Sequence, residues 1–508
     1  MRPLSKSKLI AYRQCPKRLW LEIHRPELRD DSGAEAVFRI GNEVGEIARR
    51  VYDPEGKGAL VEVAELGYDE AFRRSAFLLR KGDGPVFEAG LHGSGALAFV
   101  DVMLPTVLYG SPSWRMLEVK STTGVKDYHR DDLAIQAYLA HKMGVTLTWA
   151  GIAHLDNTFV YGGEGDYRGL FYEVDLTGEA KSRSHEVEEW IEEAREMAES
   201  TEEPAIPMGP QCCDPFNCPY AAYCSREEPA VEYPLASLPN FSGARRESVE
   251  ALGVTDLREV PDLFLTDLQR HVRDVTISGV SWFDAAGASA ALKPYDFPAS
   301  FLDFETVMMP VPVWKGTRPY QQIPFQFSLH RVEVDGTIHH DAFLELGGAE
   351  PSEPLARALV DTCGIEGPVF VYNAGFERRV IRELAGRFPD LSAPLLAIAD
   401  RIVDLLPVAK AHFYAPNQHG SWSLKAVLHA VCPDLSYDTL VGVADGQMAV
   451  EAFQEAVASE TTPERREAIR RELLAYCHLD TLALVRLWQV FRRESALTPQ
   501  GVEANETV

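Results

Sequence analysis

Residues 211–224 read QCCDPFNCPYAAYC, and this stretch divides the chain into two parts. It holds four of the eight cysteines of the chain, with Pro215 and Pro219 between them. Proline favours tight turns, so several thiolates of one short segment can point at a common centre. The stretch therefore predicts a cysteine cluster that closes one domain and precedes a second domain of different build.

The cysteine spacing supplies three ligands and requires a fourth. Cys213, Cys218 and Cys224 are separated by gaps of four and five residues. Cys15, far upstream in SKLIAYRQCPKRLW, is followed by proline and two basic residues. One thiolate from the beginning of a domain and three from its end suit an iron–sulfur cluster, expected here as [4Fe–4S]. The sequence does not decide between Cys212 and Cys213 as the ligand.

The cysteines have three roles to weigh against an iron–sulfur cluster: disulfides, zinc ligands and plain buried residues. Disulfides are disfavoured, because a chain of this size without a signal peptide is expected in the cytoplasm, where thiols stay reduced. A four-cysteine zinc site is the main alternative, since the number of ligands does not distinguish zinc from iron. Cys363, Cys432 and Cys477 stand singly in apolar surroundings and are expected to be plain buried residues.

The composition is that of a globular protein. The chain has 508 residues, of which 46% are hydrophobic and 25% charged, enough for two or three domains. No apolar run approaches the ~20 residues of a membrane span. The formal net charge of −26 argues against a protein that coats nucleic acid through bulk electrostatics. It does not exclude a nuclease, whose metal site needs carboxylates.

The N-terminal segment contains a group of basic residues that has two interpretations. They form either a local phosphate-binding patch or a solvated helix face. The residues concerned are Arg2, Lys6, Lys8, Arg13, Lys17 and Arg18.

In the first domain, acidic residues interrupt apolar strands. After a helix expected over residues 34–52, strands are expected over 86–90, 98–104 and 115–120, and a helix over 131–142. The strand FVDVML carries Asp101, and RMLEVKS carries Glu118 and Lys120, which share one face because they are two residues apart. Two carboxylates can bind Mg²⁺ or Mn²⁺, and an adjacent lysine can orient or deprotonate the attacking water.

With the one-plus-three cysteines, residues 1–225 resemble the RecB-type PD-(D/E)XK nucleases, in particular the CRISPR-associated and AddB-type iron–sulfur nucleases. The resemblance implies a restriction-endonuclease-like fold in which Asp101, Glu118 and the Val119 carbonyl hold metal and Lys120 is catalytic. It also implies that Gln136 and Tyr138 support the site and the DNA backbone.

The first domain departs from this family at two points. The family usually carries a metal-binding histidine on the first helix, but GNEVGEIAR contains none. Either Asn42, Glu43 or Glu46 takes its place, or the second metal is lost. The Gln–Tyr motif is also shortened, with one intervening residue instead of three.

Residues 226–298 are expected to form a linker and a small helical connector. The core of this connector, SGARRESVEALGV, resembles a helix–hairpin–helix element, in which a turn presents backbone N–H groups to phosphate. A plain helical spacer is the favoured alternative.

In the second domain, residues 299–497, acidic residues again occupy an apolar strand. SFLDFETV places Asp303 and Glu305 on one strand face. Glu377 opens a helix after a short strand, and Asp480 lies on the last helix, expected over 464–491. Buried carboxylates without partners are costly, which favours a working site. Four acids so distributed can hold two cations and clamp an in-line displacement at phosphorus.

This pattern resembles the DEDD exonucleases of the ribonuclease H-like fold. Asp303 and Glu305 correspond to the first motif, and Asn373 and Glu377 to the second, where the family generally has Asp in place of Glu. Tyr476 and Asp480 correspond to the third motif in its tyrosine form, since His478 is not at the position that the histidine form requires. The resemblance implies that Tyr476 positions the water and that Asn373 supports the substrate.

The sequence thus predicts an α/β protein of two mixed-sheet, nuclease-like domains, restriction-endonuclease-like and then ribonuclease H-like. The fusion resembles a bacterial family described only as a domain of unknown function. The expected function is a cytoplasmic, metal-dependent DNA nuclease with 3′–5′ exonuclease activity on single strands or ends, in DNA repair, recombination or defence against foreign DNA. The alternatives are a nucleic-acid-binding or complex-assembly protein with decayed nuclease sites, and an RNA-processing exonuclease. Residues 498–508 are expected to form a disordered tail.

Overall fold

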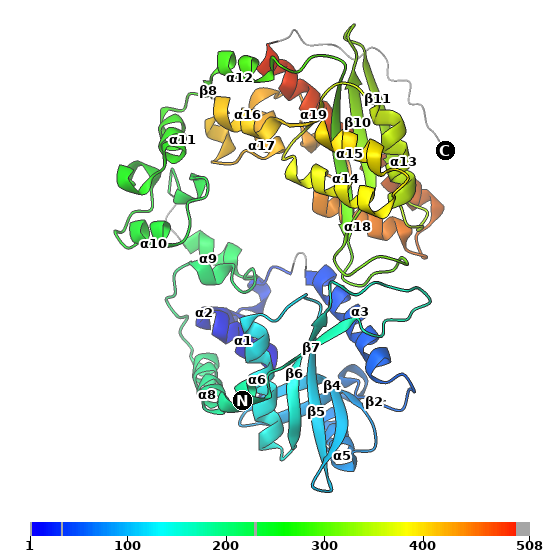
Figure 1. Ribbon diagram of the computed structural model, residues 1–508. Coiled ribbons are helices and arrows are strands. Elements are labelled where there is room, and N and C mark those ends of the chain that lie inside the picture. Colours follow the sequence, from blue (N-terminus) through cyan, green and yellow to red (C-terminus); the bar gives the residue numbers. More distant parts are fainter. Residues whose placement is uncertain (1–2, 32–33, 228–230, 494–508) are drawn as a thin grey trace. The chain divides into compact units, whose positions relative to one another are not determined.

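The computed structural model describes residues 3–31, 34–227 and 231–493 (Figure 1). The chain forms two compact units, Met1–Pro229 with Met309–Gln321, and Ala230–Met308 with Gln322–Val508. Each unit is built on a mixed sheet with helices, which confirms the predicted α/β fold class. The tail expected at 498–508 lies outside the described residues.

The first unit is built on one mixed sheet. Its strand order is β2–β3–β4–β5–β6–β7, and β1 pairs with β4. The β4–β5 pair is antiparallel and the β5–β6 pair is parallel. The three strands predicted to carry or flank the first acidic group are β3, β4 and β5. The strands are β1 Leu4–Ser5, β2 Ala59–Leu60, β3 Val86–Gly93, β4 Ala96–Leu108, β5 Ser111–Lys120, β6 Leu147–Leu155 and β7 Phe171–Asp175.

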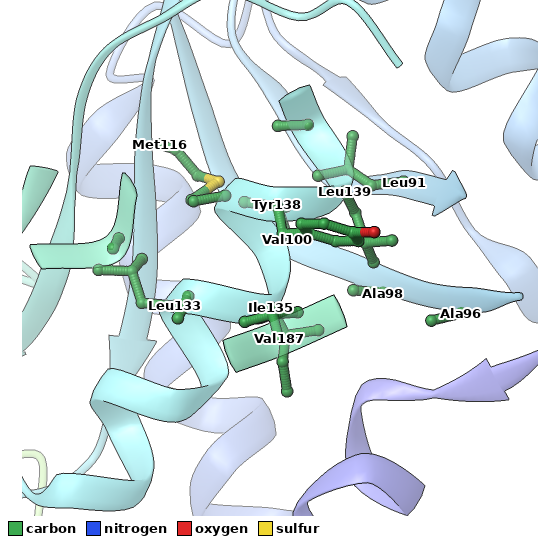
Figure 2. Close-up of a cluster of buried hydrophobic side chains, with 14 of the residues drawn as sticks. Leu91, Ala96, Ala98, Val100, Met116, Leu133, Ile135, Tyr138, Leu139 and Val187 are labelled. Carbon is green, nitrogen blue, oxygen red and sulfur yellow. The ribbon is translucent and has the colours of Figure 1, made fainter. Parts of the chain in front are cut away.

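Helix α6 provides much of the first unit's core. Its sequence is rich in Ala and Leu, which are strong helix formers, and its residues from Asp132 to Ala140 are all buried. Figure 2 shows Leu133, Ile135 and Leu139 packed with Val100 and Met116 of the sheet. The helices of this unit are α1 Lys6–Gln14, α2 Pro16–His24, η1 Pro26–Leu28, α3 Ala34–Tyr52, α4 Val63–Leu66, α5 Tyr68–Lys81, α6 Asp127–Lys142, α7 Thr177–Ser182, α8 Ser184–Glu199, η2 Pro210–Cys212 and α9 Ala221–Glu227.

Cys15 lies at the junction of α1 and α2. It ends α1 and precedes α2 in an extended conformation, with φ −163° and ψ 119°. Pro16 is the first residue of α2, where the missing backbone N–H has no helical partner to lose. The Cys–Pro pair therefore breaks the helix and places the thiol at the break.

The second unit has a five-stranded sheet of order β11–β10–β9–β12–β13. Strands β9, β10 and β11 are antiparallel neighbours, whereas β12 and β13 run parallel to β9. Strands β8 and β14 form a separate pair. The strands are β8 Trp282–Phe283, β9 Ala299–Met308, β10 Gln322–Val332, β11 Ile338–Leu344, β12 Val369–Val371, β13 Ile402–Asp404 and β14 Phe413–Tyr414.

The two faces of β9 contact different helices. Leu302 and Phe304 belong to a core with residues of α13, α14 and α15. Phe301 belongs to another core with Leu484 and Trp488 of α19. Because side chains alternate along a strand, Asp303 and Glu305 lie on the α19 face. The helices are η3 Leu235–Ser237, α10 Ala244–Glu250, η4 Leu257–Glu259, η5 Asp262–Phe264, α11 Asp267–Ser278, α12 Ala285–Leu292, α13 Ser352–Cys363, α14 Gly375–Arg387, α15 Ser392–Asp400, α16 Leu405–His412, η6 Pro416–Gln418, α17 Leu424–Val431, η7 Tyr437–Thr439, α18 Gly446–Val457 and α19 Pro463–Arg492.

The connector expected at 226–298 does not form a body of its own. From Ala230 onward it belongs to the second unit, and Val249 of α10 and Val272 of α11 share a hydrophobic core with Trp488. The segment Met309–Gln321, between β9 and β10, instead belongs to the first unit, where the Tyr320 hydroxyl donates to the Ser121 carbonyl at 2.5 Å. Local periodicity does not reveal which core such segments join.

Among the helices of the described residues, we find none whose length and apolarity would suffice to cross a membrane.

Candidate functional site

Three carboxylates converge in the second unit. Asp303 and Glu305 of β9 and Asp480 of α19 each place an oxygen within 4.8 Å of the others. Tyr476, one turn before Asp480 on α19, is buried beside them, and burial, followed by the charges of Asp480 and Glu305, raises the pKa of its phenol. The Tyr437 hydroxyl donates a hydrogen bond to Asp480 Oδ1. We call Asp303, Glu305 and Asp480 the acidic triad.

The acidic triad is short of positive charge. Burial, then the neighbouring carboxylates Asp480 and Glu305, raises the pKa of Asp303 well above its usual range. Burial and Asp480 raise the pKa of Glu305 to about 8, and burial raises that of Asp480 to about 6. Lys425 opposes both of the latter shifts, but its ammonium group donates to the Ala444 carbonyl at 2.6 Å. A divalent cation is the partner that such a group of hard oxygen ligands suits.

Glu377, in the first turn of α14, contributes a fourth acid. Its charge raises the pKa of Asp303, so the two carboxyls face a common region. Its side chain is buried, and its Oε2 has no hydrogen-bond partner in the described part of the chain. Burial raises the pKa of Glu377 to about 8. An unpartnered buried carboxylate oxygen fits a cation ligand.

Asn373 lies at the β12–α14 turn in the left-handed conformation, with φ 72°. Its backbone amide donates to Asp404 Oδ1 at 2.9 Å, and the amide of Ala374 donates to Asp404 Oδ2 at 3.0 Å. Asp404 therefore fixes the turn from which α14 presents Glu377. This role of Asp404 was not predicted, although an acidic residue directly before a helix, as in IVDLLP, is a capping signal.

The predicted group in the first unit also assembles. The Val119 amide donates to Asp101 Oδ2 at 2.6 Å, which joins β5 to β4. Glu118 accepts from Lys120 Nζ at 2.9 Å and from Gln136 Nε2 at 2.5 Å. Asp101, Glu118, Lys120 and Gln136 thus lie together, with Val119 beside them.

Three further residues enter this group that the sequence analysis did not assign to it. Lys6 of α1 contacts Glu118 Oε1 at 2.5 Å, and Asp132 of α6 accepts from Lys120 at 2.6 Å. Glu88 lies on β3 between Phe87 and Ala89, which pair with Val102 and Val100 of β4. It adopts the left-handed region with φ 54°, and its charge contributes to the raised pKa of Asp101. The sequence feature that could have identified Glu88 is its position as an acidic residue inside the apolar run VFEAG.

Some expected members lie elsewhere. The Tyr138 hydroxyl donates to Glu188 Oε1 at 3.0 Å and lies 3.0 Å from Ser94 Oγ, and its ring packs in the hydrophobic core (Figure 2). Gln136 and Tyr138 are two residues apart on a helix and therefore point in different directions. Tyr138 thus does not join Gln136 in the group around Glu118. The α3 residues expected to replace the missing histidine, Asn42, Glu43 and Glu46, are exposed.

The electrostatics of the first group differ from those of the acidic triad. Burial disfavours ionisation of Glu118, but the ammonium groups of Lys120 and Lys6 outweigh it and lower its pKa to about 2. Burial opposes protonation of Lys120, yet Glu118 and Asp132 raise its pKa above the usual range. Burial, followed by the charge of Glu118, raises the pKa of Asp101 to about 8. Lysines already balance the ionised carboxylates here.

Four cysteines line one pocket in the first unit. They are Cys15, Cys212, Cys218 and Cys224, with Lys17 and Arg18 also in the lining. Cys213, named among the expected ligands with Cys212 as its alternative, is exposed and does not line the pocket. All four lining thiols are free. Four convergent thiols beside two cations fit an anionic metal–thiolate centre.

The loop that carries these cysteines is held by α1. Gln14, next to Cys15, donates through Nε2 to the carbonyls of Gln211 and Phe216, at 2.7 and 2.6 Å. Cys363, Cys432 and Cys477 are buried and separate from the pocket, as the sequence predicts.

Most of the N-terminal basic residues form ion pairs within the first unit. Four of them pair with acidic side chains: Lys6 with Glu118, Arg13 with Asp131, Lys17 with Glu203 and Arg18 with Glu22. Arg2 lies outside the described residues. The group is therefore an ion-paired helix face more than a phosphate-binding patch.

A family model matches part of the second unit. None of the curated proteins that were searched matches the chain. Residues 300–423 match the family model described as a domain of unknown function (DUF2779), a span that includes Asp303, Glu305 and Glu377 and ends before Tyr476 and Asp480.

Proposed function

We propose that the protein is a metal-dependent nuclease whose second domain is a 3′–5′ exonuclease acting on DNA. The observation that carries the proposal is the acidic triad, with carboxylate oxygens of Asp303, Glu305 and Asp480 within 4.8 Å of one another. The nearby ammonium group of Lys425 donates to the Ala444 carbonyl. The sheet order, with three antiparallel strands continued by two parallel ones, also fits the ribonuclease H-like resemblance.

In this proposal, Asp303, Glu305, Asp480 and Glu377 hold Mg²⁺ or Mn²⁺. Bound cations would supply stabilisation of the charge that develops on the phosphoryl oxygens. Tyr437 holds Asp480 through its hydroxyl hydrogen bond. Tyr476 orients the attacking water through its phenol, which stays protonated because burial and the adjacent carboxylates raise its pKa.

The first domain has a secondary role in this proposal. Its Glu118 is occupied by Lys6 and Lys120 at 2.5 and 2.9 Å, so a cation at Asp101 and Glu118 must displace at least the Lys6 ammonium. This occupancy favours, for the first domain alone, the alternative of a binding or assembly module with a decayed site. We further propose that Cys15, Cys212, Cys218 and Cys224 hold a [4Fe–4S] cluster, with zinc as the alternative, that fastens α1 and α2 to the end of the domain.

The experiment that tests this function is a degradation assay with Mn²⁺ on 5′-labelled and 3′-labelled single-stranded DNA and RNA. The variants are Asp303→Asn and Lys120→Met, with Asp361→Asn, an exposed acid of α13, as the matched control. We expect Asp303→Asn to lose more than about 100-fold in rate, since loss of groups outside a metal's own ligands already costs 10–100-fold. Asp361→Asn retains the wild-type rate.

The label pattern and the substrate decide between the remaining alternatives. Successive shortening from the 3′ end of DNA supports the proposed polarity, and a preference for RNA selects the RNA-processing alternative. Retention of strands without cleavage by the wild type would overturn the enzyme and leave a nucleic-acid-binding protein. Participation in DNA repair, recombination or defence is part of the proposal and follows from activity on DNA ends.

A further inference from the structure

A cluster of three histidines lies in the second unit, separate from the groups described above. His330 of β10, His340 of β11 and His478 of α19 each place a ring nitrogen within 4.8 Å of the others. Their ring centroids are 4.6, 4.7 and 4.3 Å apart. One of the rings is buried and two are half-buried.

The fold brings these residues together from distant parts of the chain. His330 and His340 are direct partners in the antiparallel β10–β11 ladder, so their side chains stand next to each other on one face. Helix α19 packs on that face, where Thr481 Oγ1 lies 2.7 Å from Ser328 Oγ of β10. His478, about one turn before Thr481 on α19, completes the cluster.

A chain of hydrogen-bonding contacts joins two of the rings to hydroxyl groups. Thr481 Oγ1 lies 2.8 Å from His330 Nδ1 and 2.7 Å from Ser328 Oγ. Ser328 Oγ lies 2.9 Å from His340 Nε2. Each of these two rings therefore uses one nitrogen in a contact with a hydroxyl group.

The other nitrogens of the two rings, His330 Nε2 and His340 Nδ1, make none of these hydroxyl contacts. In a neutral imidazole one nitrogen donates and the other accepts, so a ring that donates to its hydroxyl partner has a free lone pair on the other nitrogen. Burial and the neighbouring imidazoles lower the pKa of His330 to about 2, and burial and His478 lower that of His340 to about 4, which keeps both rings neutral near pH 7. A hydrogen bond from the far ring nitrogen is the usual support for a metal-bound histidine.

We propose that His330, His340 and His478 form a binding site for a zinc-class divalent cation, with a fourth position for water. Three imidazoles suit zinc and neighbouring transition metals, whereas the carboxylates of the acidic triad suit Mg²⁺ or Mn²⁺. Ligands about 2.0–2.1 Å from a tetrahedral zinc are about 3.3 Å apart, so small side-chain rotations suffice from the observed spacing.

The position of this site gives it a structural role. The cation ties α19 to both β10 and β11, and α19 is the helix that carries Tyr476 and Asp480 of the candidate nuclease centre. Thr481, which contacts His330 and Ser328, is the neighbour of Asp480. The site therefore fixes α19 against the sheet whether or not the protein cleaves nucleic acid.

The test compares the full-length protein with His340→Gln and with His339→Gln. His339 is the adjacent, exposed residue, paired with Arg331 in the ladder, and is the matched control. Each protein is freed of bound zinc with a chelator, equilibrated with zinc and desalted. Zinc per chain is then measured by elemental analysis, and the melting temperature is recorded with and without zinc.

We expect the zinc content of wild type and of His339→Gln to exceed that of His340→Gln by roughly one zinc ion per chain, as a single three-histidine site requires. Zinc raises their melting temperature, and His340→Gln loses that rise. Equal zinc content and an equal zinc-dependent rise in all three proteins would overturn the proposal and leave a hydrogen-bonded histidine cluster.

Cobalt substitution provides an assay that needs no variant. Co²⁺ added to the metal-free wild type is expected to give visible bands of a nitrogen and oxygen ligand field without the thiolate-to-cobalt charge transfer that the cysteine pocket would produce. If the only cobalt spectrum is that of thiolate ligation, the histidines do not bind metal. Neither readout uses nuclease activity, so failure of this site is distinguishable from failure of the proposed function.

Discussion

Single residues decide the chemistry of the cysteine pocket. Cys212 lines it with Cys15, Cys218 and Cys224, whereas Cys213 is exposed. Cys212→Ser is therefore expected to abolish the cluster, while Cys213→Ser retains it. The measurement is the iron content and the absorbance of anaerobically purified protein, with the two adjacent serine variants serving as each other's control. Loss of iron in Cys213→Ser with retention in Cys212→Ser would reverse this assignment.

Glu377 gives the metal-free protein a defined pH dependence. Burial raises its pKa in the folded protein to about 8, against an ordinary value of 4.5. Its contribution to stability is therefore complete below the ordinary value and is lost as the pH rises through about 8. In chelator, the wild-type melting temperature should fall over this range more steeply than that of Glu377→Gln. Parallel melting curves across the range would show that Glu377 does not titrate in it.

At the residue scale, the sequence predicted the acids that one strand or one helix face presents. Asp303 with Glu305, and Glu118 with Lys120, follow from alternation along a strand. Lys6 could not be assigned to the first group, because its contact with Glu118 joins residues 112 positions apart. Local pattern contains no information on such pairing.

Elements were predicted better than their contacts. Helix α19, Pro463–Arg492, extends the predicted helix by one residue at each end. The pairing of β10 with β11, which places His330 opposite His340, was not predicted, because strand register depends on the turn and on which face is packed.

The junction between β9 and β12 depends on one glycine. Gly367 has φ +77°, and a Cβ there would lie 1.8 Å from the Pro298 carbonyl oxygen. Gly367→Ala is expected to lower the free energy of unfolding by more than about 2 kcal/mol, as strained substitutions do. Gly446→Ala, at the open start of α18 where nothing lies within 4 Å, is the control and should change it by less than about 0.5 kcal/mol. Urea unfolding measures both, and equal midpoints would contradict the close approach.

At the scale of the whole molecule, the sequence indicated two α/β domains but not how the chain is shared between them. The segment Met309–Gln321 belongs to the first unit although it connects two strands of the second. Residues 230–298, expected as a separate connector, complete the core of the second unit. Both assignments depend on which apolar surfaces meet in three dimensions, and composition does not reveal that.

The two acidic groups are predicted to work independently. Lys120→Met removes an ammonium from a group that is separate from the acidic triad. The rate of 3′–5′ degradation of single-stranded DNA should therefore fall by less than the roughly 10-fold that loss of a group supporting a metal site costs. Time courses on 3′-labelled and 5′-labelled strands measure this. Complete loss of degradation in Lys120→Met would place the working nuclease in the first domain.

The central claim is that the acidic triad holds the catalytic cations, and calorimetric titration of Mn²⁺ into the metal-free protein tests it most directly. Wild type, Asp303→Asn and Lys120→Met are compared at a pH above about 8, where the raised pKa of Glu305 no longer opposes ionisation. We expect Asp303→Asn to lose the tightest Mn²⁺ binding and Lys120→Met to keep it. Unchanged Mn²⁺ binding in Asp303→Asn would show that the acidic triad does not hold the cations.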